Sequence, residues 1–175
     1  RQIQIAEKRG GAKQVLATAP ARLQKLASKY GGTIADFRYL PRDDTSNLHR
    51  SGGGERYEDV NGKALVVIGH REQDAIDFAH AKMARGESLS DKEASAFYNA
   101  LRTVNHEMTH NTSAIKQADY CNSPEAFAIE EAITEEMAHQ ITIDELRADG
   151  DIDMLRWVES HPHDRATLGV YRPQR

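Results

Sequence analysis

The sequence predicts a mostly helical α+β domain with a small sheet. Several stretches place apolar residues three and four positions apart, which is typical of amphipathic helices. Strand-forming residues are concentrated in two stretches, 32–40 and 57–69. The second contains Asn61-Gly62, the strongest short-range signal for a β-hairpin. A length of 175 residues fits one compact domain with its own core.

Composition sets the broad class of the protein. Hydrophobic residues make up 39% and charged residues 29%, and no apolar run approaches the roughly 18 residues that a membrane span needs. Cys121 is the single cysteine, so we expect the fold to depend on packing or a metal rather than on an intrachain disulfide. The chain begins at Arg1 without the apolar core of a signal peptide, which predicts a fragment, a processed product or an excised domain.

Charge is unevenly distributed along the chain. Residues 1–50 carry a net charge of +6 and residues 51–175 a net charge of −10, giving the formal −4. Because the basic residues have helical spacing and lack interleaved aromatic residues, a solvated helix face is favoured over nucleic-acid binding. We expect residues 1–50 to form a basic helical segment with the first strand, and residues 51–175 to form the core, within one compact domain.

Prolines and glycines predict where the N-terminal helices and the first strand begin and end. Residues 2–17 are expected to form a loosely anchored helix that ends near Pro20. A second helix should follow, with Pro20 in its first turn and Gly31 at its C-terminal cap. Residues 32–40 then predict a strand that Pro41 ends.

The middle of the chain predicts a loop and a hairpin. Residues 42–56 are polar and glycine-rich, but their glycines do not precede Lys-Ser or Lys-Thr, so a surface loop is favoured over a phosphate-binding loop. The hairpin follows, and residues 64–68 are expected to be its buried strand.

Four further helices are predicted in the rest of the chain. The first should end at Gly86 and bury one face, which consists of Ala75, Phe78, Ala79 and Met83. Ser90 and Glu93 form a capping box that opens the next, which should run from about Asp91 to Thr109 or slightly past. Ser123-Pro124 opens a long helix to about Arg147, and a short last helix ends before Pro162.

The helix that starts at Asp91 is expected to contain the motif His106-Glu-Met-Thr-His110. Residues four apart on a helix differ by about 40° in direction and about 6 Å in height, so both imidazoles can reach one ion. Glu107 points about 100° away, where its carboxylate can lie beside a water without binding the ion. With 8 histidines in the chain, such a match is expected by chance about 0.03 times.

A catalytic zinc needs a third protein ligand, and the next helix offers glutamates within residues 130–136. Glu131 and Glu135 are four apart, so one can bind the ion while the other orients a histidine. With the HExxH motif, the segment Glu131-Ala-Ile-Thr-Glu135 resembles the glutamate helix of the gluzincin zinc metallopeptidases. The resemblance covers roughly residues 63–140, with Ala132 where the family usually has glycine.

The resemblance implies a zincin-like fold and zinc-dependent hydrolysis of a protein or peptide. His106, His110 and Glu131 would be the metal ligands, and Glu130 is the alternative to Glu131 as the third ligand. Glu107 would be the general base and Glu135 would orient a histidine ligand. Residues 63–69 resemble the edge strand that such enzymes place above the metal.

These enzymes also tend to supply a histidine or tyrosine that stabilises the oxyanion. His161 is the first candidate for this catalytic role, together with His163, and Tyr120 and His139 come next. The pair at 161 and 163 could also form a separate weak metal site.

A second hypothesis keeps the metal without catalysis. The chain would then be a structural or non-catalytic metal-binding domain of a larger assembly, such as a phage or secretion-system particle. Glu107 argues against this, because a structural site needs no base, and structural zinc more often uses cysteines.

Overall fold

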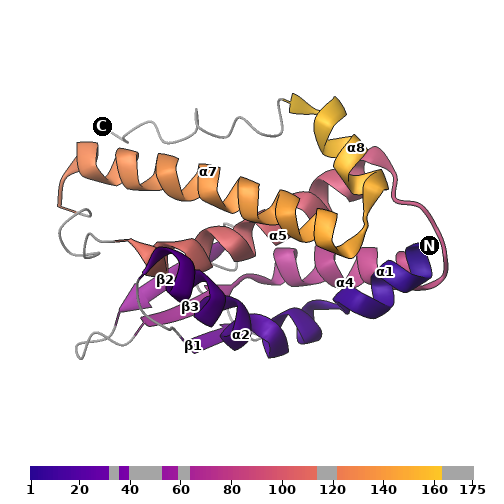
Figure 1. The fold of residues 1–175 in the computed structure, drawn as a ribbon, viewed down its shortest axis with the longest axis horizontal. Helices are drawn as coiled ribbons and strands as arrows, with labels where there is room; N and C mark the ends of the chain where they lie inside the picture. The colour runs from indigo at the N-terminus through magenta and orange to yellow at the C-terminus, as the bar shows by residue number, and fades with distance from the viewer. Residues whose placement is uncertain (32–35, 40–52, 59–63, 114–121, 163–175) are drawn as a thin grey trace.

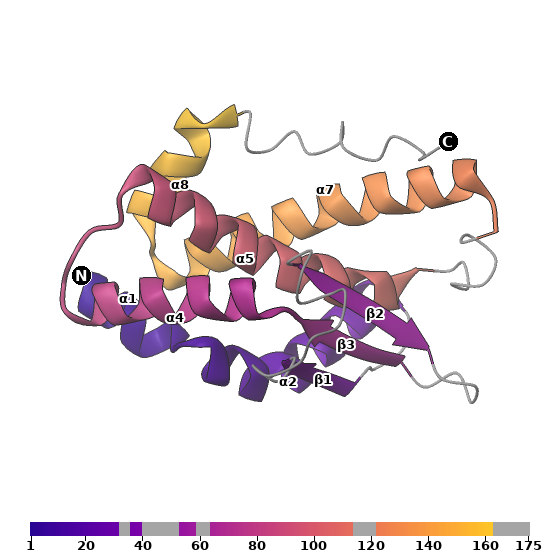
Figure 2. The same ribbon diagram turned by 180° about the vertical axis from the view of Figure 1, so that it is seen from behind.

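The computed structural model describes residues 1–31, 36–39, 53–58, 64–113 and 122–162. The protein is an α+β domain in which helices surround and extend from one small sheet (Figures 1 and 2). In chain order the helices are α1 (Gln2–Arg9), α2 (Ala12–Tyr30), α4 (His70–Ala84), α5 (Asp91–Thr109), the 3-10 turn η1 (His110–Thr112), α7 (Pro124–Asp149) and α8 (Ile152–Ser160). The strands are β1 (Asp36–Tyr39), β2 (Gly54–Glu58) and β3 (Ala64–Ile68).

The sheet has the order β1-β3-β2, so β3 is its central strand. β1 pairs with β3 in parallel, and β2 pairs with β3 antiparallel. The predicted hairpin is therefore confirmed, although Asn61-Gly62 lies outside the described residues. β2 begins at Gly54, so residues 54–56 are part of a strand and the prediction of a loop through residue 56 is wrong there.

The main hydrophobic core lies where α4 and α5 meet the sheet and the N-terminal helices. Val66 and Ile68 of β3 and Ile76 of α4 are fully buried in it, as are Phe97 and Val104 of α5. Helix α7 packs along α5 and runs across the molecule in Figure 1. The long, well-packed α5 is the element that carries the HExxH motif.

The break between the first two helices lies at Gly10–Gly11 rather than near Pro20. Gly10 has φ 68°, a conformation that glycine adopts without strain. Asp77 of α4 accepts a hydrogen bond from the backbone N–H of Ala12 at 2.7 Å, which satisfies a free donor at the start of α2. Helix α2 continues through Pro20, so the prediction of Pro20 in the first turn of a helix is wrong.

The buried face of α4 differs from the predicted one at Phe78. Ile76, Ala79 and Met83 are buried, whereas Phe78 is 52% exposed. The Lys82 ammonium lies 6.0 Å from the centre of the Phe78 ring, so this aromatic side chain packs on the surface. Ile76, which the predicted face omitted, is fully buried in the main core.

Helix starts were predicted more accurately. Ser90 and Glu93 form the complete capping box at the start of α5, and Ser123 caps α7 with Pro124 in the first turn. Helix α7 ends two residues after the expected Arg147, at Asp149, with Gly150 in the left-handed conformation. No helix within the described ranges is long and apolar enough to cross a membrane.

Candidate metal centre

The C-terminal end of α5 carries the motif. His106 and Glu107 lie in its last turn, and His110 begins the 3-10 turn that continues the helix, with φ −53° and ψ −23°. Asn111 donates hydrogen bonds to the backbone oxygens of Glu107 and Met108 at 3.4 and 3.1 Å. These bonds satisfy carbonyl groups that the end of a helix leaves free, and so hold the two histidines on one face.

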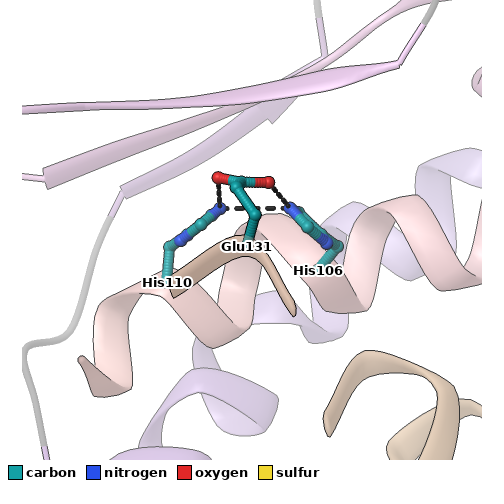
Figure 3. A group of neighbouring side chains, drawn as sticks. All are labelled: His106, His110 and Glu131. Carbon is teal, nitrogen blue, oxygen red and sulfur yellow. Dashed lines mark hydrogen bonds and ion pairs between the residues drawn. The ribbon is translucent and has the colours of Figure 1, made fainter. Parts of the chain in front are cut away.

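His106, His110 and Glu131 converge on a single point (Figure 3). All three are buried. The His106 Nε2 and His110 Nε2 atoms are 3.1 Å apart, and the Glu131 carboxylate lies 3.2 Å from the first and 3.3 Å from the second. Among the residues that the structure describes, these three form the group of donor atoms able to hold a metal ion, here called the metal-site cluster.

The spacing of these atoms fits a tetrahedral ion. Zinc binds imidazole nitrogen and carboxylate oxygen at about 2.0–2.2 Å, and two ligands of a tetrahedron at that distance lie about 3.3 Å apart. The two Nε2 atoms, 3.1 Å apart, are close to this value. The Glu131 carboxylate spans both nitrogens, with Oε2 at 3.2 Å from His106 and Oε1 at 3.3 Å from His110. Two imidazoles and one carboxylate are also the ligand types of a catalytic zinc site with an open fourth position.

The other nitrogen of each histidine faces a second set of side chains on α7. His106 Nδ1 lies 3.0 Å from the Glu135 carboxylate, a normal hydrogen-bond distance. His110 Nδ1 lies 3.6 Å from Glu130 and 3.5 Å from the Thr134 hydroxyl, which is longer than a good hydrogen bond. Glu131 therefore meets the inward-facing nitrogens, while Glu130 and Glu135 lie on the outer sides of the rings.

The pKa values of His106 and Glu131 reflect these contacts. Burial lowers the pKa of His106, but hydrogen bonds to Glu131 and Glu135 outweigh it and raise that pKa to about 10. Burial raises the pKa of Glu131, but hydrogen bonds from His106 and His110 outweigh it and lower that pKa to about 2. Without a metal, His106 and Glu131 are thus held as a charged pair, and a bound cation would take the place of the proton on His106 Nε2.

Glu107 occupies a different position from the ligands. It is buried beneath the first residue of β2: a Cβ on Gly54 would lie 2.4 Å from Glu107 Cγ and 3.1 Å from Ile68 Cδ1. Only a glycine at position 54 lets the strand approach so closely. Burial raises the pKa of Glu107, while the charges of His106 and His110 lower it. A carboxylate whose pKa is raised in this way is suited to accepting a proton near neutral pH.

Strand β2 is tied to the end of α5 by a second contact. The buried Arg56 donates a hydrogen bond from Nε to the Asn111 side chain at 2.9 Å. Gly54 and Arg56 are two residues apart on β2 and so lie on the same face of the strand, which covers both Glu107 and Asn111. This edge of the sheet, rather than β3, covers the motif. The expectation that residues 63–69 form an edge strand is wrong, because β3 lies between β1 and β2.

The structure does not bring His161 to the metal-site cluster. The His161 ring stacks on Trp157 at 4.5 Å, and its Nδ1 hydrogen-bonds the backbone oxygen of Trp157 at 2.8 Å. Trp157 in turn contacts Tyr98, which lies two turns of α5, or about 12 Å, before His106. The His139 Nδ1 atom contacts the Tyr98 hydroxyl. Tyr120 and His163 lie outside the described residues.

Three residues near the motif escaped the sequence analysis: Arg102, Gly54 and Arg56. Arg102 pairs with Glu135, and a signal for it existed, because it lies four residues before His106 on the same helical face. Gly54 and Arg56 had none, since their place over the motif depends on strand pairing between distant segments.

No protein-family model matches this chain, and no curated protein or solved structure matches it. The fold and the side chains of the metal-site cluster are therefore the basis for any functional proposal.

Proposed function

We propose that this protein is a gluzincin-type zinc metallopeptidase with a zincin-like fold. The observation that carries the proposal is the convergence of His106, His110 and Glu131 at separations of 3.1–3.3 Å, beside the buried Glu107. The order of elements also supports it, because the HExxH helix α5 is followed along the chain by α7, the helix that carries the glutamate ligand.

The ligand set favours zinc among the common divalent metals. Two imidazole nitrogens suit zinc better than magnesium or calcium, which prefer oxygen ligands. Bound at these residues, zinc would polarise the scissile carbonyl group of a substrate and lower the pKa of water at the site towards neutrality.

Glu107 would be the residue that moves the proton. It would accept a proton from the attacking water while the water oxygen forms its bond to the carbonyl carbon. It would then deliver that proton to the leaving amine as the C–N bond breaks. Metal binding and proton transfer would thus be carried out by different residues, since the metal-site cluster consists of His106, His110 and Glu131 and does not include Glu107.

An extended peptide has a natural place to bind. Strand β2 is at the edge of the described sheet, and its first residue, Gly54, packs on Glu107, so an extended peptide bound along β2 would pass close to Glu107. Pairing of this kind gives affinity through the peptide backbone and leaves sequence preference to the side chains around it. This supports a protein or peptide as the substrate.

A non-catalytic metal-binding domain of a larger assembly is the second hypothesis. It explains the metal-site cluster equally well. It gives no reason for the Glu107 carboxylate, which is not part of the metal-site cluster, to be buried next to it, where the loss of hydration costs free energy. Catalysis accounts for that cost, because burial prepares the carboxylate to accept a proton.

Replacing Glu107 tests catalysis separately from metal binding. Glu107→Gln should keep one equivalent of zinc while cleavage of a denatured protein falls by roughly 10²–10⁴-fold, the usual contribution of a general base. His106→Ala should lose the zinc itself. Glu136→Gln, at an exposed position of α7, is the matched control and should change neither. Undiminished cleavage by Glu107→Gln would exclude the mechanism, and absence of cleavage by zinc-loaded wild type would favour the second hypothesis.

A further inference from the structure

Arg102 lies one turn before His106 on α5, and its guanidinium reaches the carboxylate that holds His106. Arg102 Nη1 is 2.7 Å from Glu135 Oε1, and Glu135 Oε2 is 3.0 Å from His106 Nδ1. The carboxylate is therefore held at both oxygens, by a guanidinium on one side and an imidazole N–H on the other. All three groups lie between α5 and α7.

The guanidinium is itself held in place. Its side chain is 10% exposed, and its central carbon lies 5.7 Å from the centre of the Tyr98 ring, one turn further back on α5. A guanidinium keeps its charge in such a setting and offers donors in a fixed plane, so it orients a carboxylate more strictly than a mobile ammonium would. Contact with Tyr98 adds a favourable cation–π interaction.

Orientation of Glu135 decides which nitrogen His106 presents to the metal-site cluster. While Glu135 accepts the Nδ1–H hydrogen bond, His106 Nε2 faces Glu131 and His110. A carboxylate released at its other oxygen could rotate away, and the ring would lose the contact that fixes its rotation and tautomer. Hydrogen-bond partners of this kind commonly change metal affinity by about 10–100-fold when they are removed.

We propose that Arg102 is a positioning residue of the metal site, which holds Glu135 so that His106 keeps its proton on Nδ1 and directs Nε2 at the metal. The inference rests on the proposed zinc site and deepens it. A simple ion pair between α5 and α7 would stabilise the fold without affecting the metal, so the two roles can be separated by experiment.

Arg9 provides a matched control. Its side chain is also largely covered, at 9% exposure, and it pairs with Asp149 at 2.9 Å and Asp151 at 3.1 Å. It too lies over an aromatic ring, 5.1 Å from the centre of Phe97. Because its partners are at the junction of α7 and α8, Arg9→Met removes a similar interaction away from the metal-site cluster.

The experiment compares Arg102→Met, Arg102→Lys and Arg9→Met with wild type. Zinc affinity is measured by competition with a chromophoric chelator. The His106 Nδ1–H proton is followed by ¹H–¹⁵N NMR in metal-free and zinc-loaded protein. Arg102→Met should weaken zinc binding by about tenfold or more, and its Nδ1–H should exchange faster with water. Arg102→Lys should recover most of the affinity, and Arg9→Met should match wild type in both measurements.

Two results would overturn the inference: wild-type zinc affinity with a protected Nδ1–H in Arg102→Met, or equal losses in Arg102→Met and Arg9→Met. Arg102→Gln, which keeps a polar side chain, replaces the methionine variant if that variant does not fold. If wild type binds no zinc, the proposed function fails. Exchange of Nδ1–H in the metal-free protein then still decides whether Arg102 orients His106.

Discussion

Glu131 and Glu130 are adjacent in sequence but have different surroundings, so replacing each with alanine tests the proposed ligand set. The Glu131 carboxylate lies 3.2 and 3.3 Å from the inward-facing nitrogens of His106 and His110. Glu130 lies 3.6 Å from the outer nitrogen of His110. Both glutamates are buried to the same extent, at 7% exposure, so loss of burial affects the two variants alike.

The expected difference in zinc affinity is large. Zinc bound by four protein ligands is held by roughly 10–16 kcal/mol at neutral pH, or about 2.5–4 kcal/mol per ligand. Removing the Glu131 carboxylate should thus weaken zinc binding by about 10²–10³-fold, since each 1.4 kcal/mol corresponds to a factor of ten. Removing Glu130 should cost about tenfold or less, because it only supports His110 and does so at a long distance.

The assay is competition between each variant and a chromophoric zinc chelator, with circular dichroism to verify that both variants fold. The predicted order of zinc affinity is wild type, then Glu130→Ala, then Glu131→Ala. A reversed order would mean that Glu130 is the ligand. Equal affinities of all three proteins would mean that neither carboxylate binds the metal.

Three further predictions concern the surroundings of the site. Gly54→Ala should place a methyl group 2.4 Å from Glu107 Cγ and so destabilise the fold by about 1–3 kcal/mol in urea unfolding. The rate of cleavage should fall by a larger factor than the affinity for zinc. A variant as stable as wild type would show that β2 does not lie on Glu107. His161→Ala should leave cleavage within about twofold of wild type in a kinetic assay, as expected for a residue away from the reaction, and a loss of 10²-fold would restore its catalytic role. The Lys82 and Ser90 hydrogen bonds lower the pKa of Glu93 to about 2, below its ordinary value of 4.5, so its stabilising effect is present above pH 4.5 and is lost as the pH falls towards 2. The free energies of unfolding of wild type and Glu93→Gln should therefore converge as the pH falls from 4.5 to 2. A constant difference between these free energies would contradict the lowered pKa of Glu93.

The elements that carry the site could be predicted because their signals are local. The capping box of Ser90 and Glu93 fixes the start of α5 within a few residues, and Ser123-Pro124 does the same for α7. Helix geometry then fixes the relation between His106 and His110. The meeting of these histidines with Glu131 was expected from the resemblance, and the structure brings the three side chains together.

The errors of prediction arise from contacts between distant segments. The break at Gly10–Gly11 depends on a cap from Asp77, more than sixty residues away in the chain. Exposure of Phe78 depends on which face of α4 meets the sheet and α5. The order of the strands could not be read from residues 57–69 alone, because the central place of β3 requires β1 to pair on its other side.

Candidate residues for oxyanion stabilisation were the weakest part of the sequence analysis for the same reason. Histidine and tyrosine are common as packed or surface residues, and residue type alone gives no position in space. His161 ends the last helix, and its stacking on Trp157 follows from a spacing of four residues, which the sequence does contain.

The most direct test of the whole account is a crystal structure of the zinc-loaded protein with anomalous diffraction at the zinc edge. The account predicts a single strong peak bonded to His106 Nε2, His110 Nε2 and a Glu131 oxygen, with the fourth position open to solvent next to Glu107. An ion bound elsewhere, or a fourth protein side chain in that position, would contradict it.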